Sequence, residues 1–397
     1  MNGALLIEHY SSGILGMNLK IAFITNLPSH FHTRTFETIA EHYDTDFFFF
    51  SQGNENWIEK QNEQKFGNYR GTVVHGIQIT SRLRINTDLV KRLLQGQYDV
   101  FIQSITGRFE LLATFLISRI MRKPFILWTN LWFHPQTMFH TLTFPLTRFI
   151  YRHADALVVY GYHVKDYLVK LGVDEMKISY CWNVTDNSLY NRRVSENELA
   201  VLKKYYHLQD RYVLLFVGRL SEEKGLEYLL EAIRIIKKDL NVSLLIVGTG
   251  EREQHLKQLV REYGLEGVSF IGYIPNKELI QYYALADVFV LPSITTKTLK
   301  EVWGIVLNEA MNQGCPVIAT NAVGAAVGGL VQHGKNGLIV PERDSQSLAN
   351  AIITIFSDKK KLQSMKEFTR EEIKKWDEIK SFKGFENAIQ FVTGNSK

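Results

Sequence analysis

The sequence predicts an α/β protein made of two doubly wound, Rossmann-like domains that face each other across a cleft. Three observations support this fold class. Strand-like and helix-like segments alternate along both halves of the 397-residue chain, the strand-like segments are continuous apolar runs, and one polar stretch separates the halves. Continuous apolar runs are typical of parallel strands buried on both faces, and such strands are joined by helical crossovers. A chain of this length is expected to form about two domains.

The first domain is expected to cover residues 17–185. Its strands are predicted at residues 19–25, 46–50, 72–79, 99–104, 124–129 and 155–160. Helical periodicity falls between them, at residues 35–42, 87–95, 109–121, 142–153 and 163–171. Residues 1–16 lack the basic start of a signal peptide, and we expect them to form an N-terminal extension outside the fold.

The second domain is expected to cover residues 209–358, after a polar linker with a short helix at 186–208. Its strands are predicted at residues 211–218, 242–248, 268–272, 287–292, 316–320 and 337–341. Its helices are predicted at residues 226–238, 252–263, 276–284, 304–313 and 345–356. Residues 359–397 are expected to form two further helices.

The composition is that of an ordinary soluble protein, with 45% apolar and 22% charged residues. No apolar run is long enough to span a membrane. Two cysteines far apart indicate neither a disulfide framework nor a metal pattern, so a reducing cytoplasm is the expected location. The net charge of +5 could favour anionic substrates or an anionic membrane surface, although an ordinary charged surface explains it equally well. No basic stripe with interleaved aromatic residues indicates a nucleic-acid partner.

Two carboxylates mark the segment 292–320, which reads as strand end, loop, helix and next strand. Glu301 precedes the helix and Glu309 lies inside it. The free N–H groups of residues 302–305 would form a positive helix end that suits a phosphate. Because a carboxylate repels a phosphate, Glu301 is expected to accept hydrogen bonds from neutral hydroxyls, such as those of a sugar. Two solvated surface acids are the alternative at this point.

Further candidates in the second domain follow its predicted strands. Arg219 and Lys224 could hold a diphosphate at a helix N-terminus, or they could be surface cations. Gly248 lies in a short glycine turn that could admit a phosphate or simply turn the chain. The backbone near Tyr273 and Ile274 could contact the edge of a base.

The first domain offers polar residues after two of its strands. His30, His32 and Arg34 follow the first strand, and we interpret them as a substrate-lining loop. A metal pair of the two histidines is the weaker alternative, because no third ligand is evident. Asn130 and His134 follow the strand at 124–129, and either one could face the cleft or be structural.

Six segments in order carry a family resemblance. They are FVGRLSEEKGL, GTGERE, FIGYIPNKEL, ADVFVLPS, KEVWGIVLNEAMNQGCPVIAT and HGKNGLIVP. Together they resemble the C-terminal half of retaining GT-B glycosyltransferases of the family-4 type, the glycosyl transferases group 1. The resemblance is close over residues 211–356 and looser over the first half.

The resemblance implies that the second domain binds a nucleotide-diphosphate sugar, UDP- or GDP-linked, and that no metal or other cofactor is needed. Arg219 and Lys224 would hold the diphosphate and stabilise the leaving group. Glu301 would contact the donor sugar, and Glu309 would contact the ribose hydroxyls. Glu301 is therefore expected to discriminate between sugars. The remaining residues expected in the donor site are Gly248, Tyr273, Ile274, Trp303, Gly304, Ile305 and Val306.

The first domain would bind the acceptor, a saccharide or lipid-linked saccharide, with the final helix crossing back onto it. The acceptor residues would be His30, His32, Arg34 and Asn130, and His134 is a further catalytic candidate. The first loop departs from the family pattern because it lacks paired glycines. Asn130 also stands nearest to the position where the family usually has a histidine.

The implied function is sugar transfer in polysaccharide or glycolipid biosynthesis for the cell envelope. It would take place in the cytoplasm, with peripheral contact at the inner face of the membrane. Two alternatives remain open: a sugar-nucleotide epimerase of the same fold, and a non-catalytic partner that binds nucleotide sugars.

Overall fold

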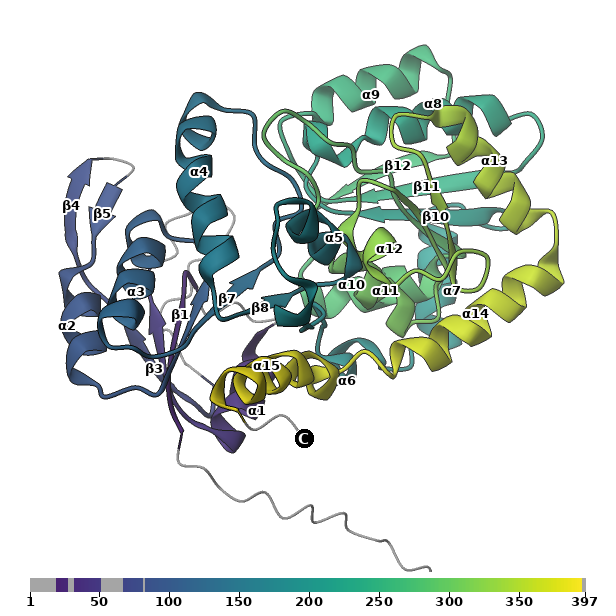
Figure 1. Ribbon diagram of the computed structural model, residues 1–397. Coiled ribbons are helices and arrows are strands. Elements are labelled where there is room, and N and C mark those ends of the chain that lie inside the picture. Colours follow the sequence, from purple (N-terminus) through teal and green to yellow (C-terminus); the bar gives the residue numbers. More distant parts are fainter. Residues whose placement is uncertain (1–18, 28–31, 51–66, 81–82, 395–397) are drawn as a thin grey trace, which may run out of the picture.

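The chain folds into two parallel sheets with helices on both faces, which confirms the predicted fold class (Figure 1). The computed structural model describes residues 19–27, 32–50, 67–80 and 83–394. The predicted extension at residues 1–16 and the predicted acceptor residue His30 lie outside these ranges.

The first sheet has seven parallel strands in the order β3-β2-β1-β6-β7-β8-β9. Their bounds are β1 Lys20–Thr25, β2 Asp44–Phe49, β3 Arg70–Val73, β6 Val100–Ser104, β7 Phe125–Thr129, β8 Ala156–Val159 and β9 Ile178–Tyr180. The helices between them are α1 Thr33–His42, α2 Thr87–Gln95, α3 Arg108–Ile120, α4 Met138–His153 and α5 Tyr162–Lys170.

The second sheet has six parallel strands in the order β12-β11-β10-β13-β14-β15. Their bounds are β10 Tyr212–Val217, β11 Val242–Val247, β12 Val268–Gly272, β13 Val288–Leu291, β14 Val317–Thr320 and β15 Gly337–Val340. The helices of this half are α8 Leu226–Ile236, α9 Glu253–Glu262, α10 Asn276–Leu285, α11 Val306–Asn312, α12 Gly324–Gly328 and α13 Ser345–Phe356.

Four local predictions were wrong or incomplete. The run at 72–79 is not one strand, because β3 ends the sheet at its edge and the chain then turns into a hairpin of β4 (Ile77–Thr80) and β5 (Leu83–Ile85). The short elements β9 and α12 were not predicted. The linker holds two helices rather than one, α6 (Asn187–Tyr190) and α7 (Glu196–Tyr205).

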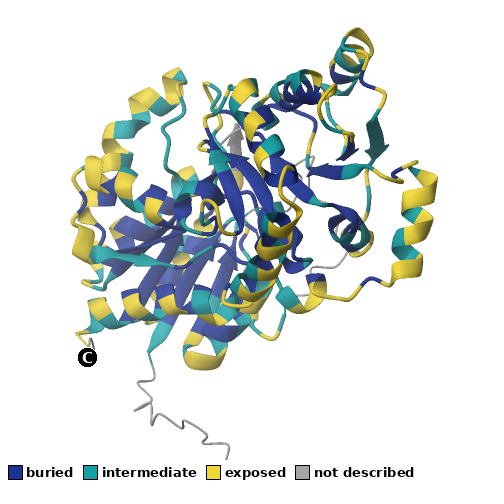
Figure 2. Ribbon diagram, turned by 90° about the vertical axis from the view of Figure 1, so that its right-hand side faces the viewer, coloured by how far each residue is buried: buried dark blue, intermediate teal, exposed yellow. Residues whose placement is uncertain are grey.

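Two helices complete the chain after the second sheet. α14 (Lys359–Ile373) packs against α11 and α13, whereas α15 (Glu378–Thr393) packs against α1, β8 and β9 of the first domain. There the Phe385 ring lies 5.5 Å from the ring of Phe23 and 5.7 Å from that of Trp128. Figure 2 shows that the strands are buried beneath helices whose outer faces are exposed. The apolar runs therefore form the core of both domains.

The strand order reverses once in each sheet. β1 lies between β2 and β6, and β10 lies between β11 and β13. At such a switch point the loops at the carboxyl ends of the two central strands run to opposite faces of the sheet and leave a crevice, where α/β proteins bind ligands. In the second domain these two loops carry Lys224 and Glu301.

Candidate active site

Lys224 and Glu301 form an ion pair at the switch point of the second sheet. The Lys224 ammonium donates to Glu301 Oε2, and the Ser293 hydroxyl lies 3.4 Å from the same oxygen. Both charged side chains are mostly buried, with 16% and 15% of their surface exposed. The structure thus joins two candidates that are 77 residues apart in the chain. Their pairing brings a cation and a carboxylate together at the switch point, the position where α/β sheets commonly bind nucleotides.

Gly225 allows the two loops to meet. It adopts φ 63° between the short 3₁₀ helix Glu222–Lys224 and α8. A Cβ atom on Gly225 would lie 2.2 Å from the Pro292 carbonyl oxygen. The Ile294 N–H also donates to the Glu223 carbonyl at 2.8 Å. The loop after β10 therefore presses directly on the loop after β13, and this contact positions Lys224.

Gly225→Ala is expected to destabilise the protein by about 2–4 kcal/mol, because the left-handed backbone and the overlap with Pro292 both add strain. Gly334→Ala is the matched control, because Gly334 has φ 82° but open space where its Cβ would be. The control should lose only about 1 kcal/mol. Urea unfolding of both variants measures the difference; equal losses would contradict a tight contact between the loops.

Two further donor-site candidates, Arg219 and Gly248, lie in the loops that follow β10 and β11. Arg219 is 56% exposed, and its guanidinium lies 3.9 Å from the Glu223 carboxylate. Gly248 donates its N–H to the Gly272 carbonyl at 2.7 Å, and a Cβ there would lie 1.9 Å from the Gly218 carbonyl oxygen. A structural reason for glycine at position 248 is therefore present, whether or not a phosphate binds there.

The loop after β12 carries the two residues expected to contact the base. The Tyr273 side chain is 60% exposed, and Ile274 is half-buried. Their contact with a base stays a prediction.

The segment between the two glutamates turns from the loop into α11. Gly304 has φ 89°, and Ile305 is the N-cap residue of α11, which begins at Val306. The Trp303 side chain is buried and donates to Asn308 Oδ1 at 2.9 Å. This side chain faces the interior, so only the backbone of Trp303 is available for the predicted donor contact.

Glu309 is buried rather than exposed on the surface of its helix. Its Oε2 accepts from the Tyr283 hydroxyl at 2.6 Å, and the hydroxyl of Tyr190 in α6 also faces it. Burial raises the pKa of Glu309, and the two tyrosine hydrogen bonds oppose that rise. A solvated surface acid is therefore the wrong interpretation, whereas the predicted contact with ribose stays a prediction.

Side chains of the first domain hold the loop that carries Glu301. The Trp132 indole N–H donates to the Glu301 carbonyl at 3.1 Å, and the Lys300 ammonium lies 3.7 Å from the centroid of the Trp132 ring. His163 Nε2 lies 3.2 Å from the Val302 carbonyl. Because a carbonyl can only accept, the Nε2 atom must carry the proton. Sequence reasoning missed Trp132 and His163, because these contacts exist only once both domains are assembled.

His163 is expected to make the protein less stable in acid. Burial lowers its pKa from 6.5 to about 4, despite the hydrogen bond to Val302. Between these two values the unfolded chain binds a proton that the folded chain does not, so stability falls as the pH falls through this window. The loss at pH 5 is about 2 kcal/mol.

Urea unfolding at pH 7.5 and pH 5 tests this, since His163→Gln should remove that part of the pH dependence. His255→Gln, at an exposed position of α9, is the control and should keep the dependence of the unsubstituted protein. An unchanged pH dependence in His163→Gln would contradict the assignment.

Two of the predicted acceptor residues meet at Tyr160, which follows β8. His32 Nε2 lies 3.0 Å from the Tyr160 hydroxyl, and the Asn130 side chain also hydrogen-bonds to this tyrosine. Arg34 lies elsewhere, 3.5 Å from both Glu37 and Asp186. The structure thus brings His32 and Asn130 together at Tyr160, whereas the Arg34 side chain faces the two acids Glu37 and Asp186.

His134 lies in an apolar cavity between α3 and α4. The centroid of its ring lies 4.1 Å from that of the Phe144 ring, with the two rings tilted by 41°, and burial is the main cause that lowers its pKa. None of the contacts found for the described residues joins His134 to Lys224 or Glu301. The position gives no support to a catalytic role for His134, and we leave it out of the proposed chemistry.

The structure is that of a two-domain α/β protein with a buried pair of opposite charges at the switch point of its second sheet. Residues 201–372 match the family described as glycosyl transferases group 1. Over 187 residues the chain is 34% identical to a GDP-mannose-dependent alpha-(1-6)-phosphatidylinositol monomannoside mannosyltransferase of Mycobacterium tuberculosis, covering 45% of this chain and 48% of that protein. Over 146 residues it is 36% identical to the amylovoran biosynthesis glycosyltransferase AmsK of Erwinia amylovora, covering 36% and 35%. The chain thus spans less than half the length of these two relatives.

A solved structure extends the likeness of fold to nearly the whole chain. Anabaena HepE, crystallised in complex with UDP, superposes with a TM-score of 0.72 and 21% identity, covering 94% of this chain and 100% of HepE. The protein therefore has the GT-B fold, and its residues 201–372 match the glycosyl transferases group 1.

Proposed function

We propose that this protein is a retaining glycosyltransferase that moves a sugar from a UDP- or GDP-linked donor to a saccharide or lipid-linked saccharide. The observation that carries the proposal is the Lys224–Glu301 pair at the switch point of the second sheet. The match of this half to group 1 glycosyl transferases and the names of its relatives support the same activity. The reaction would serve polysaccharide or glycolipid synthesis in the cytoplasm.

The proposed chemistry assigns opposite tasks to the two charges. As the bond between the sugar C1 and the donor phosphate oxygen breaks, negative charge builds on the diphosphate, and Lys224 with Arg219 stabilises it. Glu301 accepts hydrogen bonds from the sugar hydroxyls. Before the donor binds, Lys224 and Glu301 neutralise each other. When the donor binds, the Lys224 ammonium must therefore leave the Glu301 carboxylate and pair with the diphosphate.

The acceptor hydroxyl would attack C1 from the face that the diphosphate leaves. A new bond forms between the acceptor oxygen and C1, and the acceptor proton passes to the departing phosphate oxygen. This route retains the configuration at C1 and needs no nucleophile from the protein. Trp132 and His163 would support it by holding the Glu301 loop against the first domain, where water can be excluded.

The proposal is tested first by thermal shift with a panel of UDP-, GDP- and ADP-sugars, and then by transfer from the stabilising donor to lipid-linked acceptors. NMR of the product should show the anomeric configuration of the donor. An inverted product would refute retention. Conversion of the donor without an acceptor would instead identify an epimerase, and donor binding without turnover would identify a non-catalytic partner.

A further inference from the structure

The helix α4 lies on the outside of the first domain (Figure 1), and exposed apolar side chains form a stripe along it. Its residues recur at helical spacing, and the two most exposed, Met138 and Leu142, are 81% and 74% exposed. The stripe consists of Met138, Phe139, Leu142, Leu146 and Phe149. Five large apolar side chains on one exposed helix face are more than scattered surface residues explain, and such a patch indicates an interaction surface.

The stripe continues onto α3, which packs beside α4. The Phe115 and Phe149 rings lie 6.1 Å apart, and the Arg108 guanidinium lies 3.8 Å from the centroid of the Phe139 ring. On α3, Leu116 and Ile120 are also exposed, the second to 76%. We call the exposed residues of these two helices the α3–α4 face.

Positive charge is concentrated at the same face. Residues 108–153 contain six arginines and lysines against the single acid Glu110. Two of the six cations form ion pairs with acids outside this segment, Arg119 with Asp155 and Lys123 with Asp99. Glu110 is buried and bonded to Asn86, so it does not offset the charge at the surface. The cations are Arg108, Arg119, Arg122, Lys123, Arg148 and Arg152.

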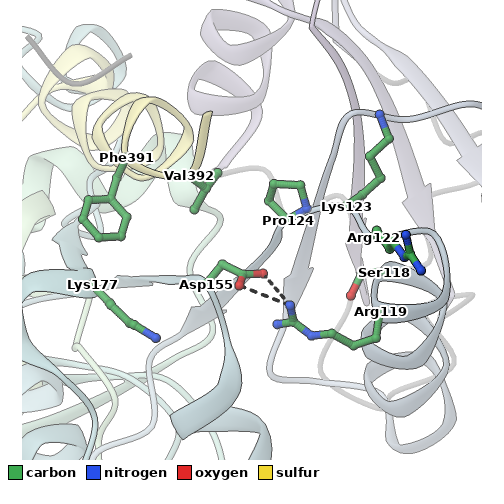
Figure 3. A pocket seen from close by; sticks show the side chains of 9 residues that line it. All are labelled: Ser118, Arg119, Arg122, Lys123, Pro124, Asp155, Lys177, Phe391 and Val392. Atoms are coloured by element: carbon green, nitrogen blue, oxygen red, sulfur yellow. Dashed lines mark hydrogen bonds and ion pairs between the residues drawn. The ribbon is translucent and has the colours of Figure 1, made fainter. Parts of the chain in front are cut away.

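Three of these cations gather where α3 ends. Figure 3 shows Arg119, Arg122 and Lys123 around a cavity of about 600 Å³, beside Lys177 and the exposed Phe391 of α15. Arg119 pairs with Asp155 at 3.0 Å, whereas the Arg122 side chain is exposed and points away from that pair. The positive rim thus reaches from Arg108 at one end of the face to Arg122 at the other.

We propose that the α3–α4 face binds the surface of an anionic lipid bilayer. Apolar side chains next to arginines and lysines bind such a surface, because the apolar groups enter the boundary between headgroups and acyl chains and the cations pair with lipid phosphates. No helix in the part of the chain that the structure describes is long and apolar enough to cross a membrane. The contact is therefore peripheral.

The face also connects with the cleft. An apolar cavity of about 220 Å³ between α3 and α4 is lined by Leu131, Phe133 and Pro135 of the loop after β7. Trp132 in the same loop donates to the Glu301 carbonyl. A bilayer on the α3–α4 face would lie next to the loop that meets the donor site, so it would supply a lipid-linked acceptor. This use of the contact, unlike the contact itself, rests on the proposed function.

The test is co-sedimentation of the full chain with vesicles of phosphatidylglycerol and phosphatidylethanolamine, compared with vesicles of phosphatidylcholine alone. We expect binding to the anionic vesicles that weakens as salt rises. Leu142→Glu with Leu146→Glu should lower the partition coefficient at least about tenfold, and Arg148→Glu with Arg152→Glu should do the same.

Matched controls carry the same changes elsewhere. Met176→Glu with Val201→Glu changes two exposed apolar residues outside the face, and Lys203→Glu with Lys204→Glu reverses two cations of α7. Both controls should bind vesicles as the unsubstituted protein does. Equal loss in face and control variants, or no vesicle binding by the unsubstituted protein, would overturn the proposal. The proposal would also be overturned if light scattering showed a dimer that the α4 substitutions dissociate while they leave vesicle binding unchanged.

Vesicle binding is measured without donor or acceptor, so its failure is separable from that of the proposed function. Titration with UDP and GDP reports on the donor site alone. A protein that binds vesicles but no nucleotide would refute the proposed function and leave the membrane contact standing, and the reverse result would refute only the membrane contact.

Discussion

Lys224→Ala is expected to lower kcat for sugar transfer by about 10²–10³-fold, which is the effect of removing one pre-organised positive partner of a developing negative charge. The Lys224 side chain is only 16% exposed at the switch point, so water screens its charge little. The variant should also bind the free nucleoside diphosphate more weakly, because the cation contacts the diphosphate before and during the reaction.

Lys366→Ala is the control for this substitution. Lys366 forms a comparable half-buried ion pair with Asp287 at 2.8 Å. Asp287 is the residue directly before β13. Its loss should lower stability without lowering kcat. If Lys224→Ala transfers sugar at the rate of the Lys366→Ala variant, Lys224 has no role in stabilising the leaving group.

Glu301→Gln is expected to lower kcat/KM for the complete donor by about 10–100-fold, since an amide replaces one oxygen acceptor by a donor and removes the charge that strengthens hydrogen bonds to hydroxyls. Binding of the free nucleoside diphosphate should not share this loss. In the absence of a donor, Glu301 neutralises Lys224. Removing the carboxylate charge frees the ammonium, so the nucleoside diphosphate should bind equally well or more tightly.

The sugar dependence of Glu301→Gln separates a sugar contact from a general defect. The loss should vary among donors that differ in the configuration of their hydroxyl groups, and kcat/KM for several such donors measures this variation. A uniform loss across donors, accompanied by weaker binding of the nucleoside diphosphate, would show that Glu301 acts only by holding the loop in place.

The strands were largely predictable because parallel strands buried on both faces leave continuous apolar runs in the sequence. The prediction failed at 72–79, where an edge strand and a hairpin share one apolar pattern, and at β9, which has only three residues. Neither the hairpin nor the short strand β9 alters the pattern of apolar residues from which the strands were predicted. The strand order, and with it the position of the cleft, depends on pairings that the local pattern does not contain.

The donor site could be predicted only as a set of separate residues. Arg219, Lys224 and Glu301 were selected by chemistry and by family resemblance, and the ion pair that joins two of them depends on the close approach of Gly225 to Pro292. The burial of Glu309 was not visible in the sequence, because its partners lie on α10 and in the linker.

Trp132 and His163 were missed for a different reason. Both contact the Glu301 loop across the domain boundary, and such contacts depend on how the two domains meet. By contrast, the positive charge of residues 108–153 was present in the sequence from the start, and only the structure shows that it shares one face with an exposed apolar stripe.

The central claim is that Lys224 holds the donor diphosphate while Glu301 holds the sugar, and calorimetric titration with UDP and GDP tests it most directly. The unsubstituted protein should bind one of the two nucleotides, Lys224→Ala should raise its Kd at least about tenfold, which corresponds to loss of one charge-assisted contact, and Glu301→Gln should leave the Kd unchanged or lower it. An unchanged Kd in Lys224→Ala, or a rise of equal size in both variants, would contradict the claim.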